Sequence, residues 1–302
     1  MDIQKCNICP HNCGIDRKIF ANGFCRSSIK AKISSVCIHK GEEPVISGKN
    51  GIINIFFAHC NLQCIYCQNY EISRNNNDDF EEIDNILIAE KIISLLNESE
   101  NIVGFVSPSH FVHNVVEIIN CIRQKNKNPI FVYNSNGYDS VESIKELDGK
   151  IDVYLPDFKY SNNNLALKLS NIKNYTETTL NAIKEMYNQK GSSLFINPKT
   201  GIAESGLIIR HLLLPGFLQQ SKDVLKIIAE EISTSINISL MSQYFPPKKI
   251  LTYKTLNQNI TQNEYNELID YYYKLGFYKG WIQELSSKDC YRPNIANNII
   301  DF

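Results

Sequence analysis

The chain has 302 residues, 43% of them hydrophobic, which is enough to bury one large α/β core. Its 31 basic and 32 acidic residues nearly balance and no dense Lys/Arg block occurs, so we expect no nucleic-acid or membrane partner. The polar start does not fit a signal peptide, and no apolar run is long enough to span a bilayer. We therefore expect a soluble protein of the cytoplasm.

The first 50 residues form a leader that is rich in cysteine. The chain has ten cysteines, and seven of them fall in two short clusters, a spacing that in an intracellular protein indicates metal binding rather than disulfides. The leader cysteines follow the spacing C-x2-C-x3-C-x11-C, and they are Cys6, Cys9, Cys13 and Cys25. Two thiolate pairs can close one site, so we predict an auxiliary iron–sulfur cluster or a structural zinc, with His11 and Cys37 as substitute ligands. The alternative is that these thiols are simply reduced and buried.

The second cluster follows an apolar run at 52–58 that predicts a strand. The loop after this run carries Cys60, Cys64 and Cys67. Three thiolates on one loop can hold three irons of a cubane iron–sulfur cluster and leave the fourth iron without a protein ligand. Electron-transfer clusters normally take four cysteines. The open iron therefore predicts a site where a small molecule binds the cluster and reacts.

Beyond this loop, predicted strands and helices alternate along the chain. The strands are predicted at 101–106, 129–133, 151–155, 207–214, 236–241 and 277–285. The helices are predicted at 84–97, 112–122, 140–147, in a longer stretch that ends near 189, at 221–232 and at 261–275. Asp84 is the expected N-cap of the first helix, and Thr261 with Glu264 forms a capping box for the last. Residues 190–205 are predicted as a loop.

Polar or turn-forming residues recur at the ends of these strands. They stand in the cysteine loop and at 107–110, 134–136, 157–159 and 215–216. The alternation predicts a parallel sheet, and chemistry at the carboxyl ends of strands is typical of a barrel. We therefore predict an α/β fold, a partial (β/α)6 TIM-like barrel over 51–302, with a Cys-rich metal-binding extension over 1–50.

The cysteine loop resembles a known motif. The spacing C-x3-C-x2-C, with Tyr66 before the last cysteine and a strand before the loop, is similar to the motif of the radical S-adenosylmethionine (radical SAM) superfamily. Further stretches along the whole chain resemble its pyruvate formate-lyase activating enzyme-like group. These stretches are 9–13, 41–44, 67–71, 107–110, 155–160, 210–216, 239–244 and 280–283.

The resemblance implies cofactors and roles. Cys60, Cys64 and Cys67 would hold a 4Fe-4S cluster, and S-adenosylmethionine would chelate the open iron through its amino and carboxylate groups. One electron, from a donor such as flavodoxin or ferredoxin, would cleave the sulfonium, and the 5′-deoxyadenosyl radical so formed would abstract a hydrogen atom from a substrate. The positions implied to contact the cofactor are Ser107, Ser109, Asn134, Asn136, Asp157, Lys159 and His211, with Arg210 lining the same mouth.

Two positions depart from the family pattern. The Gly-Gly-Glu stretch that contacts the cofactor's amino group in the family is absent, and 107–109 stand in its place, so the cofactor contacts would be rearranged. His59 stands beside Cys60 where relatives tend to have a small residue, and we interpret it as a packing residue. No catalytic side chain is assigned.

Three hypotheses of function follow. The leading one is an anaerobic oxidoreductase that uses radical chemistry, with a glycyl-radical protein, a small molecule or a peptide as its substrate. The second is a non-catalytic iron–sulfur electron-transfer protein, which suits the four-cysteine leader but not the three-cysteine loop. The third is a zinc-organised RNA-binding protein, against which the balanced charge and the lack of an aromatic and basic surface stretch both count.

Overall fold

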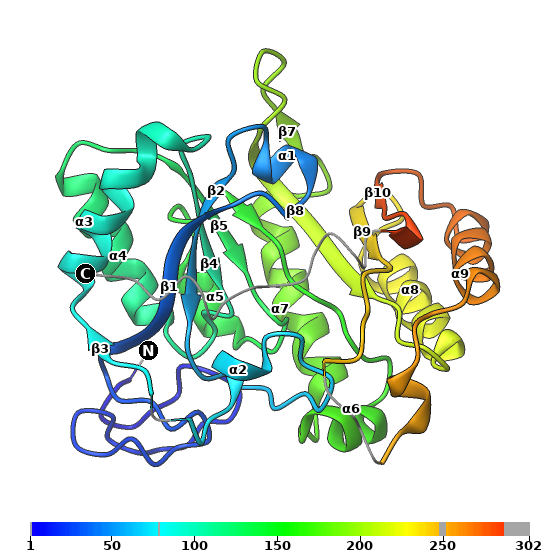
Figure 1. Ribbon diagram of the computed structural model, residues 1–302, viewed down its shortest axis with the longest axis horizontal. Helices are drawn as coiled ribbons and strands as arrows, with labels where there is room; N and C mark the ends of the chain where they lie inside the picture. Colours follow the sequence, from blue (N-terminus) through cyan, green and yellow to red (C-terminus); the bar gives the residue numbers. More distant parts are fainter. Residues whose placement is uncertain (1, 78, 248–251, 287–302) are drawn as a thin grey trace.

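A computed structural model describes residues 2–77, 79–247 and 252–286. Within these residues the strands form one open sheet in the order β10-β9-β8-β6-β5-β4-β2-β1-β3, and β7 pairs with β8 (Figure 1). Its parallel part consists of β2 (Ile52–Phe57), β4 (Ile102–Val106), β5 (Ile130–Asn134), β6 (Val153–Tyr154), β8 (Ala203–Leu212), β9 (Asn237–Met241) and β10 (Gly280–Ile282). Three strands pair antiparallel, β1 (Ala31–His39) with β2, β3 (Glu82–Ile83) with β1, and β7 (Phe195–Ile196) with β8.

Helices follow the parallel strands and cover the outside of the sheet (Figure 1). The long ones are α3 (Asn85–Leu95), α4 (Val112–Gln124), α5 (Val141–Glu146), α6 (Asn163–Ser170), α7 (Tyr175–Lys190), α8 (Leu218–Glu231) and α9 (Gln262–Lys274). The short ones are α1 (Pro44–Ser47), α2 (Tyr70–Ser73), η1 (Leu96–Glu98) and η2 (Lys254–Asn257). Six strand-and-helix units before β10, in a sheet that does not close, confirm the predicted partial TIM-like barrel. None of the helices in the described residues is both long and apolar enough to cross a membrane.

Two apolar clusters explain why these segments fold this way. On β8, Leu207 and Ile209 belong to the large cluster that the helices cover, whereas Ile208 belongs to a smaller cluster inside the barrel. Successive side chains of a strand point to opposite faces, so a strand that is buried on both faces must be apolar throughout. On α4, Val115 and Ile119 are fully buried, as their helical spacing predicts.

Several predicted boundaries are confirmed, and others need correction. Asp84 caps α3 by accepting from the Ile86 N–H, and the capping box of Thr261 and Glu264 is present. The long helical stretch is two helices, because Asn171 ends α6 in a left-handed conformation at φ 60°. The predicted loop at 190–205 contains β7 and the start of β8, and α8 begins three residues before the predicted start.

The leader is not separate from the sheet. β1 lies within residues 1–50, was not predicted, and pairs along its length with β2. The boundary that we predicted at residue 50 stays a prediction, and the predicted end of the barrel domain at residue 302 lies outside the described residues.

Candidate functional site

The three-cysteine loop begins where β2 ends, and His59 fixes its direction. His59 has φ 65°, is fully buried, and donates its backbone N–H to the Ile72 carbonyl at 2.7 Å. Its ring lies 2.9 Å from the carbonyl of Cys25 and 2.8 Å from that of Asn77. The ring therefore packs between the leader and the segment after the loop, as we interpreted from the sequence.

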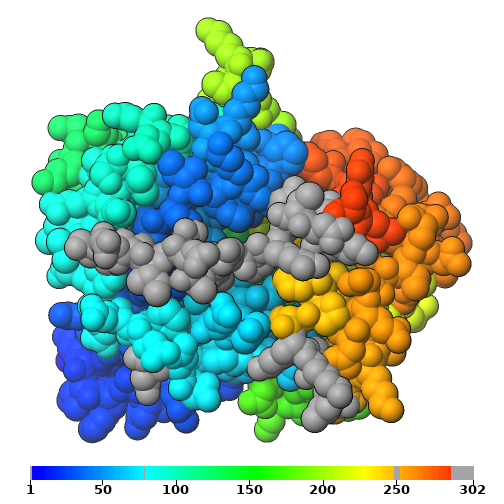
Figure 2. Space-filling view, viewed as in Figure 1, coloured from blue at the N-terminus to red at the C-terminus, as the bar shows by residue number. Residues whose placement is uncertain are grey.

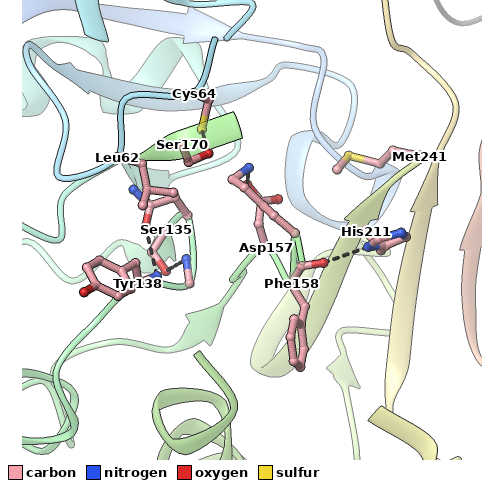
Figure 3. A network of polar contacts seen from close by, with 12 residues as sticks. Leu62, Cys64, Ser135, Tyr138, Asp157, Phe158, Ser170, His211 and Met241 are labelled. Atoms are coloured by element: carbon pink, nitrogen blue, oxygen red, sulfur yellow. Dashed lines mark hydrogen bonds and ion pairs between the residues drawn. The ribbon is translucent and has the colours of Figure 1, made fainter. Parts of the chain in front are cut away.

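Each of the three sulfurs of the loop accepts a hydrogen bond. Cys60 Sγ accepts from the Leu62 N–H and from the Asn136 amide, both at 3.3 Å. The Ser170 hydroxyl donates to Cys64 Sγ at 2.9 Å (Figure 3), and the Ser73 hydroxyl donates to Cys67 Sγ at 3.3 Å. Hydrogen bonds to sulfur favour the charged thiolate and are among the features that set the potential of iron–sulfur clusters.

The three sulfurs also lie close enough to influence one another electrostatically. Burial raises the pKa of Cys60 to about 12, and the charges of Cys64 and Cys67 add to the rise while the Leu62 N–H opposes it. Without metal the Cys60 thiol is therefore protonated at neutral pH, and metal binding would release its proton. Across the described ranges, no three His, Cys, Asp or Glu side chains stand at the spacing of ligands to a single metal ion. The ligands available for a metal group at this loop are therefore the three thiolates, whose sulfurs accept hydrogen bonds from the protein.

The structure brings Asn136 and the pair of Asp157 and Lys159 to this loop. The ammonium of Lys159 lies 2.5 Å from Asp157 Oδ2. Burial acts to lower the pKa of Lys159, but the charges of Asp157 and Cys64 raise it above its ordinary value. Gly137 makes this arrangement possible, because at φ 80° a Cβ there would stand 2.1 Å from the Asp157 carbonyl oxygen. Only glycine lets the loop after β5 pass so close to the end of β6.

Other predicted residues lie at neighbouring strand ends. Ser107 has φ 54° and donates its backbone N–H to the Asn134 carbonyl at 2.9 Å, which joins the ends of β4 and β5. Ser109 is buried, and its hydroxyl has no hydrogen-bond partner among the described residues. These three predicted residues thus lie at the ends of β4 and β5, and among the described contacts it is Asn136 that joins this region to the cysteine loop.

His211 and Arg210 point to opposite faces of β8. The ring of His211 is fully buried, and its Nδ1 lies 2.7 Å from the Phe158 carbonyl (Figure 3). The described contacts join this ring to the strand end at Asp157 and Phe158, and not to the cysteine loop. Arg210 pairs with Glu42 and Glu43, with its Nε 2.8 Å from Glu43 Oε1.

Some polar contacts of the site were missed by sequence reasoning. Ser73 is the last residue of α2 and Ser170 is the last residue of α6, and neither lies in a recognisable sequence motif. Ser170 is separated from Cys64 by 106 residues, so only the tertiary fold brings the two together. Asn61 was also missed, although it directly follows Cys60, and its amide donates to the Tyr138 carbonyl at 2.7 Å.

The leader lies at the same end of the barrel as α2 (Figure 1). Cys6, Cys9 and Cys25 are buried and Cys13 is half-buried. Cys37 lies on β1, opposite Asn54 of β2. His11 Nε2 lies 2.8 Å from the carbonyl of Asn61, and the ring stacks on Phe24 with 3.7 Å between centroids.

Comparisons with known proteins give one family match and one related sequence. The family model described as the radical SAM superfamily matches residues 54–197. An uncharacterised protein of Methanocaldococcus jannaschii is 30% identical over 274 residues, which cover 88% of this chain and 74% of that protein.

Two solved structures have a similar fold. One is a radical SAM methyltransferase from Sphaerobacter thermophilus, with a TM-score of 0.53, 10% identity and coverage of 77% of this chain and 66% of that chain. The other is Streptococcus suis SuiB bound to S-adenosylmethionine, with a TM-score of 0.51, 10% identity and coverage of 77% and 50%. This chain therefore spans a little under two thirds of the first protein and half of the second, and the likeness is one of fold.

Proposed function

The chain belongs to the radical SAM superfamily, and from this premise we propose that it is an enzyme in which Cys60, Cys64 and Cys67 hold a 4Fe-4S cluster. When bound, the cluster and S-adenosylmethionine supply one-electron cleavage of the sulfonium and a 5′-deoxyadenosyl radical that abstracts a hydrogen atom from a substrate. The observation that carries the proposal is that every sulfur of the loop accepts a hydrogen bond from the protein. Such donors favour the thiolates that iron requires.

The residues that donate to sulfur act in this proposal as positioning residues. Asn136 connects the loop to β5, Ser170 connects it to α6, and Ser73 connects it to α2. Because the three donors come from different elements, each sulfur is held independently of the others. Outer contacts of this kind orient metal ligands and tune the metal.

Asp157 and Lys159 are proposed to bind the polar groups of S-adenosylmethionine. The amino acid part of that cofactor carries one ammonium and one carboxylate, and a paired carboxylate and ammonium at the strand end offers the complementary charges. The charge of Cys64 is one of the causes of the raised pKa of Lys159, so this lysine remains protonated beside the cluster loop. The other proposed contacts are Ser107, Ser109, Asn134, Asn136 and His211.

We further propose that the enzyme is a member of the pyruvate formate-lyase activating enzyme-like group. The sequence stretches that resemble this group support the proposal, among them 41–44 and 155–160. The first contains Glu42 and Glu43, whose carboxylates pair with the Arg210 guanidinium. In this proposal a flavodoxin or ferredoxin delivers the electron, and the hydrogen atom comes from a glycyl-radical protein, a peptide or a small molecule.

The test is cleavage of S-adenosylmethionine by the anaerobically reconstituted and reduced protein. We expect 5′-deoxyadenosine from the unchanged chain and from Cys121→Ala, a control cysteine outside both cysteine groups. We expect none from Cys64→Ala, which removes a ligand. Absence of 5′-deoxyadenosine from the unchanged chain, with iron content unaltered by replacing Cys60, Cys64 and Cys67 with alanine, would overturn the proposal.

A further inference from the structure

We propose that Cys6, Cys9, Cys13 and Cys25 form a second metal centre, an iron–sulfur cluster with four thiolate ligands, and that His11 couples this centre to the loop that carries Cys60. The family match begins at residue 54 and does not extend to the leader. The first part of the proposal is independent of the proposed function. The second part rests on it, because it needs a cluster at the three-cysteine loop.

Backbone hydrogen bonds fold the leader so that its cysteines meet. The Cys6 N–H donates to the Ile15 carbonyl at 2.9 Å, and the Gly14 N–H donates to the Cys6 carbonyl at 3.0 Å, which closes the segment that contains the first three cysteines. The Phe24 N–H donates to Cys13 Sγ at 3.4 Å, which attaches the turn of the fourth cysteine. A Cβ at Gly23 would stand 3.3 Å from the same sulfur. The four thiols are therefore neighbours in space.

A backbone donor is directed at one of these sulfurs, as at the other loop. The Phe24 N–H donates to Cys13 Sγ at 3.4 Å, just as the Leu62 N–H donates to Cys60 Sγ at 3.3 Å. A neutral buried thiol gains little from such donors, whereas a metal-bound thiolate needs them. The leader thus shares with the three-cysteine loop a backbone N–H that donates to a cysteine sulfur.

A buried cation beside the leader cysteines is a second indication that a negatively charged metal centre binds there. Arg17 is 1% exposed, and its guanidinium donates to the carbonyls of Ser27, Ser28 and His110. Among the described residues no carboxylate forms an ion pair with it. An isolated buried charge is costly unless an opposite charge compensates it. Four thiolates on an iron–sulfur cluster carry a net negative charge that would compensate Arg17.

His11 joins the two cysteine groups. It lies in sequence between Cys9 and Cys13, and its Nε2 is 2.8 Å from the carbonyl of Asn61, the residue that follows Cys60. The Asn136 amide, which donates to Cys60, also donates to Asn61 Oδ1 at 2.7 Å. Figure 2 shows the leader surface in contact with that of the segment around residue 75, where the Asn75 amide donates to the Phe24 carbonyl. Metal binding in the leader should therefore restrain the loop that carries Cys60.

The first experiment counts metal in a chain that lacks the other site. The variant with alanine at Cys60, Cys64 and Cys67 is purified anaerobically, and its iron, sulfide and zinc are measured. We expect it to retain iron with sulfide, since four thiolates suit an iron–sulfur cluster, whereas zinc without sulfide would overturn the proposed cluster. The further changes Cys9→Ala and Cys25→Ala should remove this metal. A triple variant that retains no metal overturns the centre, whatever the activity of the unchanged chain.

The control for this measurement uses a cysteine outside both groups. Cys37→Ala and Cys121→Ala, each made in the triple variant, should leave the metal content unchanged. Loss of the metal in Cys37→Ala would contradict the proposed ligand set. Circular dichroism of every variant checks whether a loss of metal is caused by unfolding.

The second experiment tests the coupling with two substitutions of His11. His11→Phe keeps an aromatic ring against Phe24 but loses the contact to the Asn61 carbonyl, whereas His11→Gln can still donate to it. We expect His11→Phe to shift the midpoint potential and the electron paramagnetic resonance spectrum of the cluster at Cys60, and His11→Gln to restore both. Unchanged values in His11→Phe, with the leader metal retained, would overturn the coupling.

Discussion

At the scale of single residues, the contact between Asn136 and Cys60 is the most specific feature of the site. One side-chain amide donates to the cysteine sulfur at 3.3 Å and to Asn61 Oδ1 at 2.7 Å. The amide is buried, so water cannot easily replace it when it is removed. The effect of Asn136 on the midpoint potential of a bound cluster can therefore be measured separately from a general effect on folding.

Substitution of Asn136 should lower the potential of the cluster. In Asn136→Ala the sulfur of Cys60 loses one donor, and because donors to sulfur stabilise the reduced, more negative cluster, we expect a more negative midpoint potential. A redox titration followed by electron paramagnetic resonance measures the shift. Asn266→Ala, which removes an exposed amide on α9, should leave the potential unchanged. Equal potentials in Asn136→Ala and the unchanged protein would show that this contact does not tune the site.

At the scale of elements, the packing of β2 against β4 inside the barrel depends on one glycine. Asn54 on β2 pairs in register with Gly104 on β4, and the Asn54 amide donates to Glu42 Oε1 at 2.7 Å. A Cβ on Gly104 would stand 2.2 Å from Asn54 Oδ1. The glycine thus leaves room for the amide that orients Glu42 toward Arg210.

Adding a methyl group at this position should destabilise the fold. We expect Gly104→Ala to lower the free energy of unfolding by about 1–3 kcal/mol, the usual effect of overpacking a buried site. Urea unfolding measures the change. In an Asn54→Ala background the clash with Asn54 is absent and only the milder contact with Ile52 Cδ1, at 2.9 Å, remains, so the same substitution should cost less there. An equal cost in both backgrounds would mean that the clash with Asn54 is not the cause.

At the scale of the whole molecule, three buried histidines connect stability to pH. Burial lowers the pKa of His110 to about 3, and that of His113 and His211 to about 4. Each ring is bonded to one carbonyl of another segment: His110 to Ala58, His113 to Ile29, and His211 to Phe158. In the unfolded chain they titrate near 6.5, so the unfolded state binds more protons below that pH.

Stability should therefore be full above pH 6.5 and should fall as the pH decreases from 6.5 toward 4. For His113, a folded pKa of about 4 against about 6.5 unfolded corresponds to a loss of about 2 kcal/mol between pH 7.5 and pH 5. Urea unfolding at the two pH values measures the loss, and His113→Gln isolates the share of this histidine because the variant cannot titrate there. A variant that loses as much stability as the unchanged protein would refute the assignment.

The sequence by itself determined the local features of this protein. The spacing of Cys60, Cys64 and Cys67 after an apolar strand predicted the loop that carries the proposed site, and the alternation of strands and helices predicted the partial barrel. The caps at Asp84 and Thr261 were also predicted correctly. These features depend on residues that are near one another along the chain, where periodicity and spacing already fix the geometry.

Only the tertiary structure decided which distant residues meet. Ser170 reaches Cys64 across 106 residues, and the two faces of β8 separate Arg210 from His211. The sequence did not predict β1 or the break between α6 and α7, because the first depends on pairing with β2 and the second on a single residue in a left-handed conformation. Such contacts follow from strand order and register, which local patterns do not encode.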